Sequence, residues 1–163
     1  MILSALPTRS TFKATKLLPL AVSLRAARLV YSGLALFDGL DLELAGGSFT
    51  CLLGPSGIGK SSLLRLLAGL TSPGISGELL GGDGQSLGGR VAYMAQQDLL
   101  LPWLNVLDNI TLGHRLRGEK ADQPQALDLL AQVGLADAAF TRPDILSGGM
   151  RQRAALARTL MED

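Results

Sequence analysis

The sequence predicts an α/β fold in which a mixed sheet with an antiparallel edge carries a helical subdomain. Short β-prone runs separated by glycines fill the first half of the chain. One of them, residues 49–53 (FTCLL), leads directly into a glycine-rich loop and a helical pattern. After residue 96 the pattern becomes helical. Strands followed by an inserted helical block indicate an α/β core with a second, helical part.

Composition narrows the class of protein. A chain of 163 residues is long enough for one domain with a substantial core. The formal net charge is only +1, so the chain lacks the basic surplus typical of nucleic-acid binding, and we expect no nucleic-acid partner. The single cysteine, Cys51, excludes an intrachain disulfide, and its place in a predicted core strand indicates a buried thiol. No apolar run approaches the ~20 residues of a membrane-spanning helix.

The N-terminal segment differs from the rest of the chain in charge. The first acidic residue of the whole chain is Asp38, and several lysines and arginines precede it. The apolar run 17–22 is short and is broken by Pro19, which is unlike a secretory signal. We therefore expect residues 1–21 to be a disordered or non-native extension, and residues 22–163 to form the domain.

The predicted strands alternate or are uniformly apolar, and turn residues bound them. They span residues 23–31, 34–37, 40–44, 49–53 and 90–94. The first is expected at the edge of the sheet, and Gly39 separates the second from the third. Residues 71–89 are rich in glycine and serine, which predicts a hairpin or loops.

The predicted helices span residues 61–70, 103–114, 124–133 and 148–161. The first (SSLLRLLAGL) is apolar on nearly every face and is expected to be buried. Pro124 suits the first turn of the third. The helical subdomain is expected to cover residues 95–160.

Residues 54–61 (GPSGIGKS) have the composition of a phosphate-binding loop. Its glycines let successive backbone N–H groups turn toward an anion. Lys60 can reach the β- and γ-phosphates of a nucleotide, and the Ser61 hydroxyl can ligate Mg²⁺. The predicted strand before the loop and the helix after it are the context that this motif requires. The candidate nucleotide-binding residues are Gly54, Pro55, Ser56, Gly57, Ile58, Gly59, Lys60, Ser61 and Ser62.

A second motif, LSGGM followed by RQR, begins the last predicted helix. A serine and two glycines at a helix start leave N–H groups free at the positive end of the dipole, which favours an anion. Behind them, apolar residues recur on one face, while Arg151 and Arg158 mark a separate polar face. The candidate residues of the motif are Leu146, Ser147, Gly148, Gly149 and Met150.

With these two motifs the sequence resembles the ATP-binding subunits of ABC transporters over about residues 22–163. GPSGIGKS resembles the Walker A motif, and LSGGM with RQR resembles the ABC signature. Residues 93–110 (YMAQQDLLLPWLNVLDNI) are similar to the Q-loop region of importers, and alignment on Pro102 and Trp103 makes Gln96 the Q-loop residue. Tyr31 precedes Lys60 by 29 residues (60 minus 31), the spacing of the family's adenine-stacking aromatic.

The resemblance implies an ABC-type P-loop NTPase core with a helical signature subdomain, and ATP and Mg²⁺ as cofactors. It assigns catalytic roles to Lys60 and Gln96, the metal to Ser61 and Gln96, and adenine stacking to Tyr31. Two copies would form a homodimer around two ATP molecules, with residues 146–150 of each copy facing the ATP of the other. Transmembrane permease subunits would be direct partners, and a solute-binding protein an indirect one. The chain would act in the cytoplasm, on the inner face of the cell membrane.

The motifs look most like those of importers for nitrate, sulfonate, taurine or thiamine-precursor substrates. In such proteins a Walker B strand ending in Asp-Glu and an H-loop histidine follow the signature helix. This sequence ends at Asp163, 16 residues after Ser147 (163 minus 147), and its single histidine, His114, precedes the signature. We therefore expect the C-terminal part of the fold to be missing and this chain alone to be inactive. His114 is expected at the surface, and Trp103 as a packing residue.

Two alternatives remain open. One is a non-catalytic, truncated fragment that at most binds nucleotide. The other is a soluble ABC ATPase that acts outside transport, in DNA repair or translation. A P-loop kinase would not explain the signature helix.

Overall fold

The computed structural model describes residues 20–31, 33–70 and 74–162. The predicted extension, residues 1–21, lies outside these residues except for Leu20 and Ala21. The chain divides into two compact units. The first contains residues 1–63 and 71–86, and the second contains residues 64–70 and 87–163.

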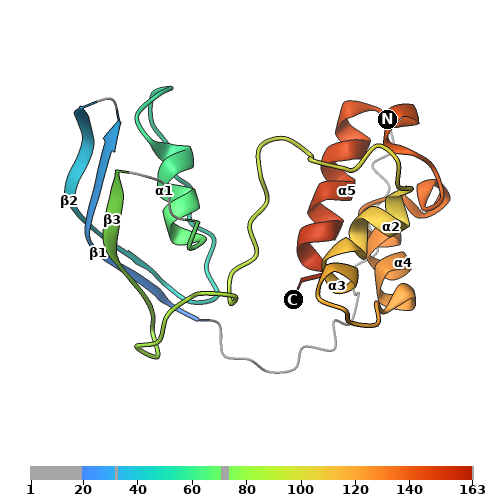
Figure 1. Ribbon diagram of the computed structural model, residues 1–163, viewed down its shortest axis with the longest axis horizontal. Helices are drawn as coiled ribbons and strands as arrows, with labels where there is room; N and C mark the ends of the chain where they lie inside the picture. The colour runs from blue at the N-terminus through green and yellow to red at the C-terminus, as the bar shows by residue number, and fades with distance from the viewer. Residues whose placement is uncertain (1–19, 32, 71–73, 163) are drawn as a thin grey trace, which may run out of the picture. The chain divides into compact units, whose positions relative to one another are not determined.

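The first unit contains an antiparallel three-stranded sheet in the order β2-β1-β3 (Figure 1). Its strands are β1 (Val22–Tyr31), β2 (Leu34–Leu44) and β3 (Ile75–Gly81). The prediction that the first strand lies at an edge is wrong, because β1 is central and buries Leu24, Ala27 and Leu29.

Strand β1 is irregular in its middle. Both of its ladders shift register near Ala26, which has a left-handed backbone (φ 46°). The Ala26 N–H donates instead to Asp41 Oδ1 at 2.8 Å. Opposite this bulge, a Cβ on Gly77 would lie only 2.9 Å from the Ala27 Cα, so glycine allows β3 to approach β1 closely.

One prediction for this sheet is wrong and another is confirmed. The runs at residues 34–37 and 40–44 form one strand, β2, which continues through Gly39 at φ +73°. The prediction of a hairpin or loops in residues 71–89 is confirmed, because β3 is followed by a turn that brings Ser86 into an antiparallel bridge with Leu80.

Residues 49–53 and 90–94 were both predicted as strands, and neither forms one: the described sheet consists of β1, β2 and β3. Phe49 is fully exposed and Leu53 is 88% exposed. Cys51 is exposed too, so the expectation of a buried thiol is wrong. The physical reason is that an extended run becomes a strand only when a neighbouring strand bonds its N–H and C=O groups.

Helix α1 (Lys60–Leu67) follows the glycine-rich loop. Leu63 and Leu66 are buried on it, whereas Leu64 is 48% exposed. The helix is therefore amphipathic, and the prediction that nearly every face is buried is wrong.

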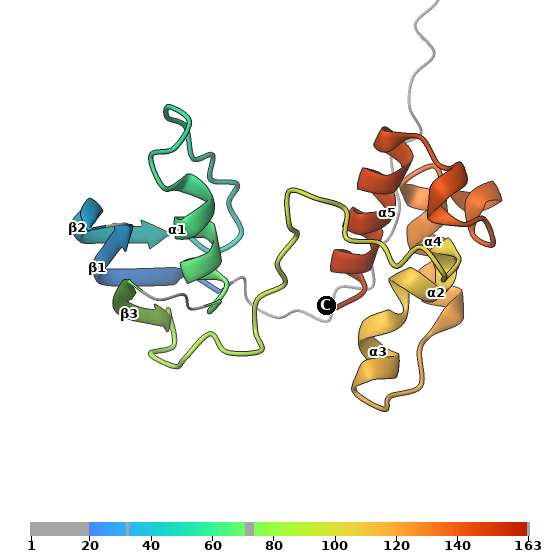
Figure 2. The same cartoon turned by 45° about the horizontal axis from the view of Figure 1, so that its top comes forward.

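The second unit is helical, and Figure 2 shows α2 and α4 beside α5. Its helices are α2 (Val106–Ile110), α3 (Leu112–Leu116), α4 (Gln123–Gln132) and α5 (Gly148–Leu160), with 3₁₀ turns at Ala136–Ala138 and Pro143–Ile145. Ala154, Ala157 and Met161 are fully buried in the core, which confirms the predicted apolar face of the last helix. Asp122 caps α4 by accepting the Gln125 N–H at 3.0 Å.

The helix predicted over residues 103–114 is instead two short helices that meet at Thr111. Asn105 caps α2 by accepting the Asp108 N–H at 2.8 Å. Asn109 is completely buried, and its Oδ1 accepts the Leu101 N–H at 2.7 Å. Its Nδ2 donates to the carbonyls of residues 101, 104 and 105 at 2.9–3.2 Å. One amide thus fixes the non-helical turn before α2.

Candidate functional site

The phosphate loop, residues 54–59, needs its glycines for backbone conformation. Gly57 has φ +81° and Gly59 has φ +98°, values that favour glycine strongly. A Cβ on Gly59 would lie 3.3 Å from a Leu29 methyl and 3.5 Å from the Phe37 ring. The loop therefore runs close to side chains of β1 and β2, and glycine is the residue that fits there.

Lys60 begins α1 and turns back over the loop. Its Nζ donates to the carbonyl oxygens of Gly54 at 2.8 Å and Pro55 at 2.6 Å. No acidic residue lies in the first turn of α1, and Ser61 is exposed there. A helix start also leaves backbone N–H groups without intrahelical partners. The site thus presents an ammonium, a hydroxyl and N–H donors.

This donor set fits the phosphates of ATP, because every group in it favours negative charge or donates hydrogen bonds. Mg²⁺ is usually held by one or two protein oxygens together with substrate phosphates, and the Ser61 hydroxyl is such an oxygen. Tyr31, the predicted adenine-stacking residue, ends β1 and is 71% exposed. These residues all belong to the first unit.

The signature turn, residues 146–150, begins α5 in the second unit. The Ser147 side chain is the N-cap and accepts the Met150 N–H at 3.3 Å. Leu146 is buried in the core, whereas Ser147, Gly148 and Gly149 are exposed. A Cβ on Gly149 would meet no atom within 4 Å. The positive end of the α5 dipole therefore faces open space, as an anion site requires.

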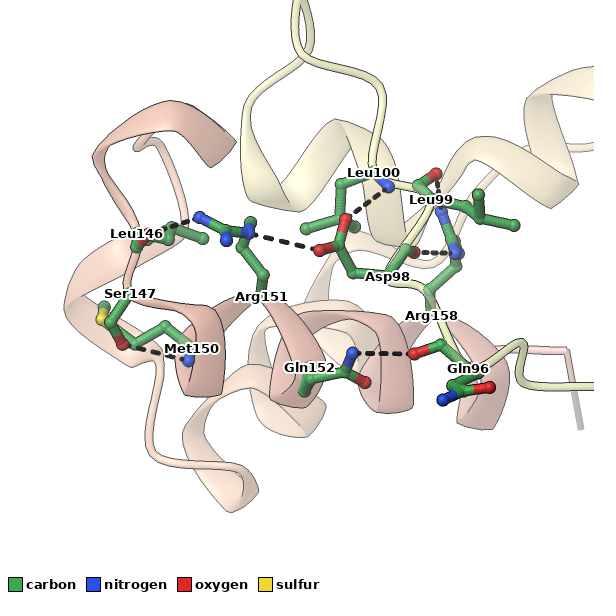
Figure 3. Close-up of polar contacts among 10 residues, drawn as sticks. All are labelled: Gln96, Asp98, Leu99, Leu100, Leu146, Ser147, Met150, Arg151, Gln152 and Arg158. Carbon is green, nitrogen blue, oxygen red and sulfur yellow. Dashed lines mark hydrogen bonds and ion pairs between the residues drawn. The ribbon is translucent and has the colours of Figure 1, made fainter. Parts of the chain in front are cut away.

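Gln96 lies in the same unit, in a segment without helix or strand, and is exposed. Figure 3 shows that its main-chain oxygen, rather than its side-chain amide, accepts from Gln152 Nε2 at 3.0 Å. Two residues later, Asp98 pairs with Arg151 through Nε and Oδ2 at 3.2 Å. The structure thus brings Gln96 beside the helix that carries the signature turn.

Arg158 completes this region by donating to the main-chain oxygens of Asp98 at 2.6 Å and Leu99 at 2.8 Å. Partial burial lowers the pKa of Arg158, and attraction to Asp98 and Glu162 opposes that effect. Sequence reasoning identified the Arg151 and Arg158 face but missed Asp98, its partner. The sequence signal that could have identified this partner is the position of Asp98, an acidic residue only two positions after Gln96.

Two expectations about neighbouring residues are wrong. Trp103, expected to pack inside the helical subdomain, is 67% exposed. His114, expected at the surface, is partly buried, and its Nδ1 has no hydrogen-bond partner among the described residues.

Comparison with known proteins supports the assignment from the motifs. The family model described as ABC transporter matches residues 37–163. The aliphatic sulfonates import ATP-binding protein SsuB 1 of Mesorhizobium japonicum is 48% identical over 127 residues, which are 76% of this chain and 47% of that protein. The corresponding SsuB protein of Ralstonia nicotianae is 47% identical over 148 residues, 88% of this chain and 50% of that protein. The chain spans about half the length of these curated relatives.

Solved structures agree. A bacterial Atm1-family ABC exporter with ATP bound matches with a TM-score of 0.74 at 29% identity, over 90% of this chain and 28% of that chain. A dimeric ATP-binding cassette in a post-hydrolysis state, bound to ADP and Pi, matches with a TM-score of 0.73 at 28% identity, over 86% of this chain and 69% of that chain. The chain belongs to the ABC transporter family and carries part of its ATP-binding domain.

Proposed function

We propose that this chain is part of the ATP-binding subunit of an ABC importer and binds ATP with Mg²⁺ at residues 54–62. The observation that carries the proposal is the position of the Lys60 ammonium. This ammonium is held over the glycine-rich loop by two carbonyls, at the start of a helix without acidic residues in its first turn. Exchange of these carbonyls for phosphate oxygens would give the ammonium a charged partner.

Each remaining site residue has a role that its position supports. The exposed hydroxyl of Ser61 would ligate Mg²⁺, which when bound would neutralise charge that develops on the phosphates. Tyr31 offers an exposed ring for stacking on adenine. The Gln96 amide would contact the metal or orient the attacking water, since its contact with α5 uses the main-chain carbonyl.

The signature turn supports a second proposal, that two copies form a dimer. The exposed start of α5 would face the ATP held by the other copy, so that each ATP lies between two chains. Permease subunits would be the direct partners and a solute-binding protein an indirect one, on the cytoplasmic face of the membrane. Among the described residues, no helix combines the length and the apolar character needed to cross a bilayer.

We propose sulfonates as the substrate class, because the relatives named above are aliphatic sulfonate import proteins. We also propose that this chain alone binds ATP without ordinary turnover, since its sequence contains no Asp-Glu pair to hold the metal and polarise water. Phosphate release slower than ~1 s⁻¹, below ordinary enzyme rates, is the expected result.

Thermal unfolding with and without MgATP tests the binding site. At a concentration about 100 times Kd, a ligand of the folded state stabilises it by about 2.7 kcal/mol, which raises Tm by several degrees. Lys60→Ala should abolish this rise. Arg65→Ala is the matched control, because Arg65 is an exposed cation on the same helix, and it should keep the rise. An undiminished rise in Lys60→Ala would refute the assignment.

A further inference from the structure

Three polar side chains of α5 bind the segment around Gln96. Arg151, Gln152 and Arg158 contact residues 96–99, and together they are called the α5 clamp (Figure 3). Most of its contacts are to main-chain oxygens. The clamp therefore fixes the backbone of residues 96–99 directly, because these contacts do not depend on the side chains of that segment.

The clamped segment has an unusual shape. Leu99 has φ +48°, a left-handed conformation that is uncommon for a bulky residue and persists only when the surroundings impose it. Arg158 supplies that constraint by holding the carbonyls of Asp98 and Leu99 with one guanidinium. Asp98 Oδ1 adds to it by accepting the Leu100 N–H at 3.1 Å. Helix α5 thus determines the conformation of this turn.

Arg151 connects the same segment to the signature turn. Its Nε donates to Asp98 Oδ2 at 3.2 Å, and its Nη1 donates to the Leu146 carbonyl at 2.8 Å. Leu146 directly precedes Ser147, the N-cap of α5. Because a guanidinium is planar and rigid, these two bonds fix the separation of Asp98 from Leu146. The Asp98 and Arg151 side chains are only 27% and 37% exposed, so solvent weakens the pair less than at an open surface.

We propose that Asp98 and Arg151 are positioning residues that make the Gln96 segment and the signature turn move as one body. The consequence rests on the proposed function. Gln96 would report on the ATP held by its own chain, while the signature turn would contact the ATP of the second copy. The Asp98–Arg151 pair would then be the link through which occupancy of one site sets the position of the other.

Amide hydrogen exchange on the whole chain, without nucleotide, tests this link. Asp98→Asn keeps the oxygen that accepts the Leu100 N–H but removes the charge that pairs with Arg151. The expected result is an increase of about fivefold in the exchange rates of the Met150 and Arg151 amides, which donate to Ser147 Oγ and to the Ser147 carbonyl. These amides are far from the substitution in sequence, and their exchange rises because local opening of the signature turn becomes easier. Arg151→Lys should cause a similar increase, since an ammonium cannot reproduce the two bonds that the planar guanidinium makes to Asp98 and to the Leu146 carbonyl. Asp98→Glu keeps the charge that pairs with Arg151, so its exchange should be slower than that of Asp98→Asn.

Arg153 provides the matched control. It lies on α5 and donates to the Val133 carbonyl at 2.8 Å, away from the clamp. Arg153→Met should increase exchange near residue 134 and leave exchange of the Met150 and Arg151 amides unchanged.

Two outcomes would overturn the proposal. One is unchanged exchange of the Met150 and Arg151 amides in Asp98→Asn, which would give Asp98 a purely local role. The other is a uniform rise across α2, α4 and α5, which would indicate global destabilisation. Both readouts are independent of ATP, so a failure of the proposed function, seen in the MgATP melts, is distinguishable from a failure of the link.

Discussion

Asn109→Ala should destabilise the helical unit more than any surface substitution. Asn109 is completely buried, and its amide bonds one N–H and three carbonyls of the turn before α2. An NH₂ group has only two hydrogens, so about three bonds form at once. At about 1 kcal/mol each they contribute about 3 kcal/mol, and the orphaned Leu101 N–H adds about 1–2 kcal/mol. The expected loss is therefore about 4–5 kcal/mol.

Urea unfolding followed by circular dichroism measures this loss through the shift of the midpoint at constant m. Asn105→Ala is the control, because it removes a single capping bond to the Asp108 N–H and should cost about 1 kcal/mol. Asn109→Asp keeps the acceptor for Leu101 but places a buried carboxylate among three carbonyl oxygens, so it should cost at least as much as Asn109→Ala. A loss for Asn109→Ala no larger than that for Asn105→Ala would refute the reasoning.

Three further substitutions or modifications test other features. Ser147→Ala should lower stability by about 1 kcal/mol in the same titration, because the Met150 N–H loses its acceptor; no change would exclude the cap. Gly74→Ala should lower Tm by several degrees, since Gly74 has φ +84° and a Cβ would collide with the Val30 carbonyl oxygen; a neutral result would contradict this turn geometry. Cys51 should react with Ellman's reagent in the folded protein within about tenfold of the unfolded rate, and much stronger protection would contradict its exposure.

Local signals predicted the elements that local contacts determine. Pro124 predicted the start of α4, and the serine and glycines of the signature motif predicted the start of α5, because these signals act within one helical turn. The division of the predicted helix over residues 103–114 depends instead on the contacts of Asn109 with the turn before it, and on burial of that turn. Sequence periodicity does not contain that information.

The order of strands was harder to predict for the same reason. β1 alternates weakly, as an edge strand does, yet it is central because β3, distant in sequence, pairs with it. Residues 49–53 have strand composition without a described partner. Propensity therefore identified a segment capable of pairing, whereas pairing itself depends on a second segment.

The candidate site likewise has parts that the sequence predicts and parts that it does not. The phosphate loop and the signature turn are contiguous motifs whose chemistry can be interpreted residue by residue. The Asp98–Arg151 pair joins residues 53 positions apart, and only the packing of α5 against the preceding segment brings them together. A contact of that kind is visible only in three dimensions.

The exposed run at residues 49–53 has a consequence for the behaviour of the chain in solution. It is uncharged, lacks proline and contains aromatic and β-branched side chains, which is the composition that favours intermolecular β-pairing. Its Phe49 is fully exposed, and its backbone pairs with no strand among the described residues, so the run is a template for a second molecule. We therefore expect concentration-dependent aggregation to start next to the phosphate loop, so that a polypeptide pairing with this run would act as a solubility factor.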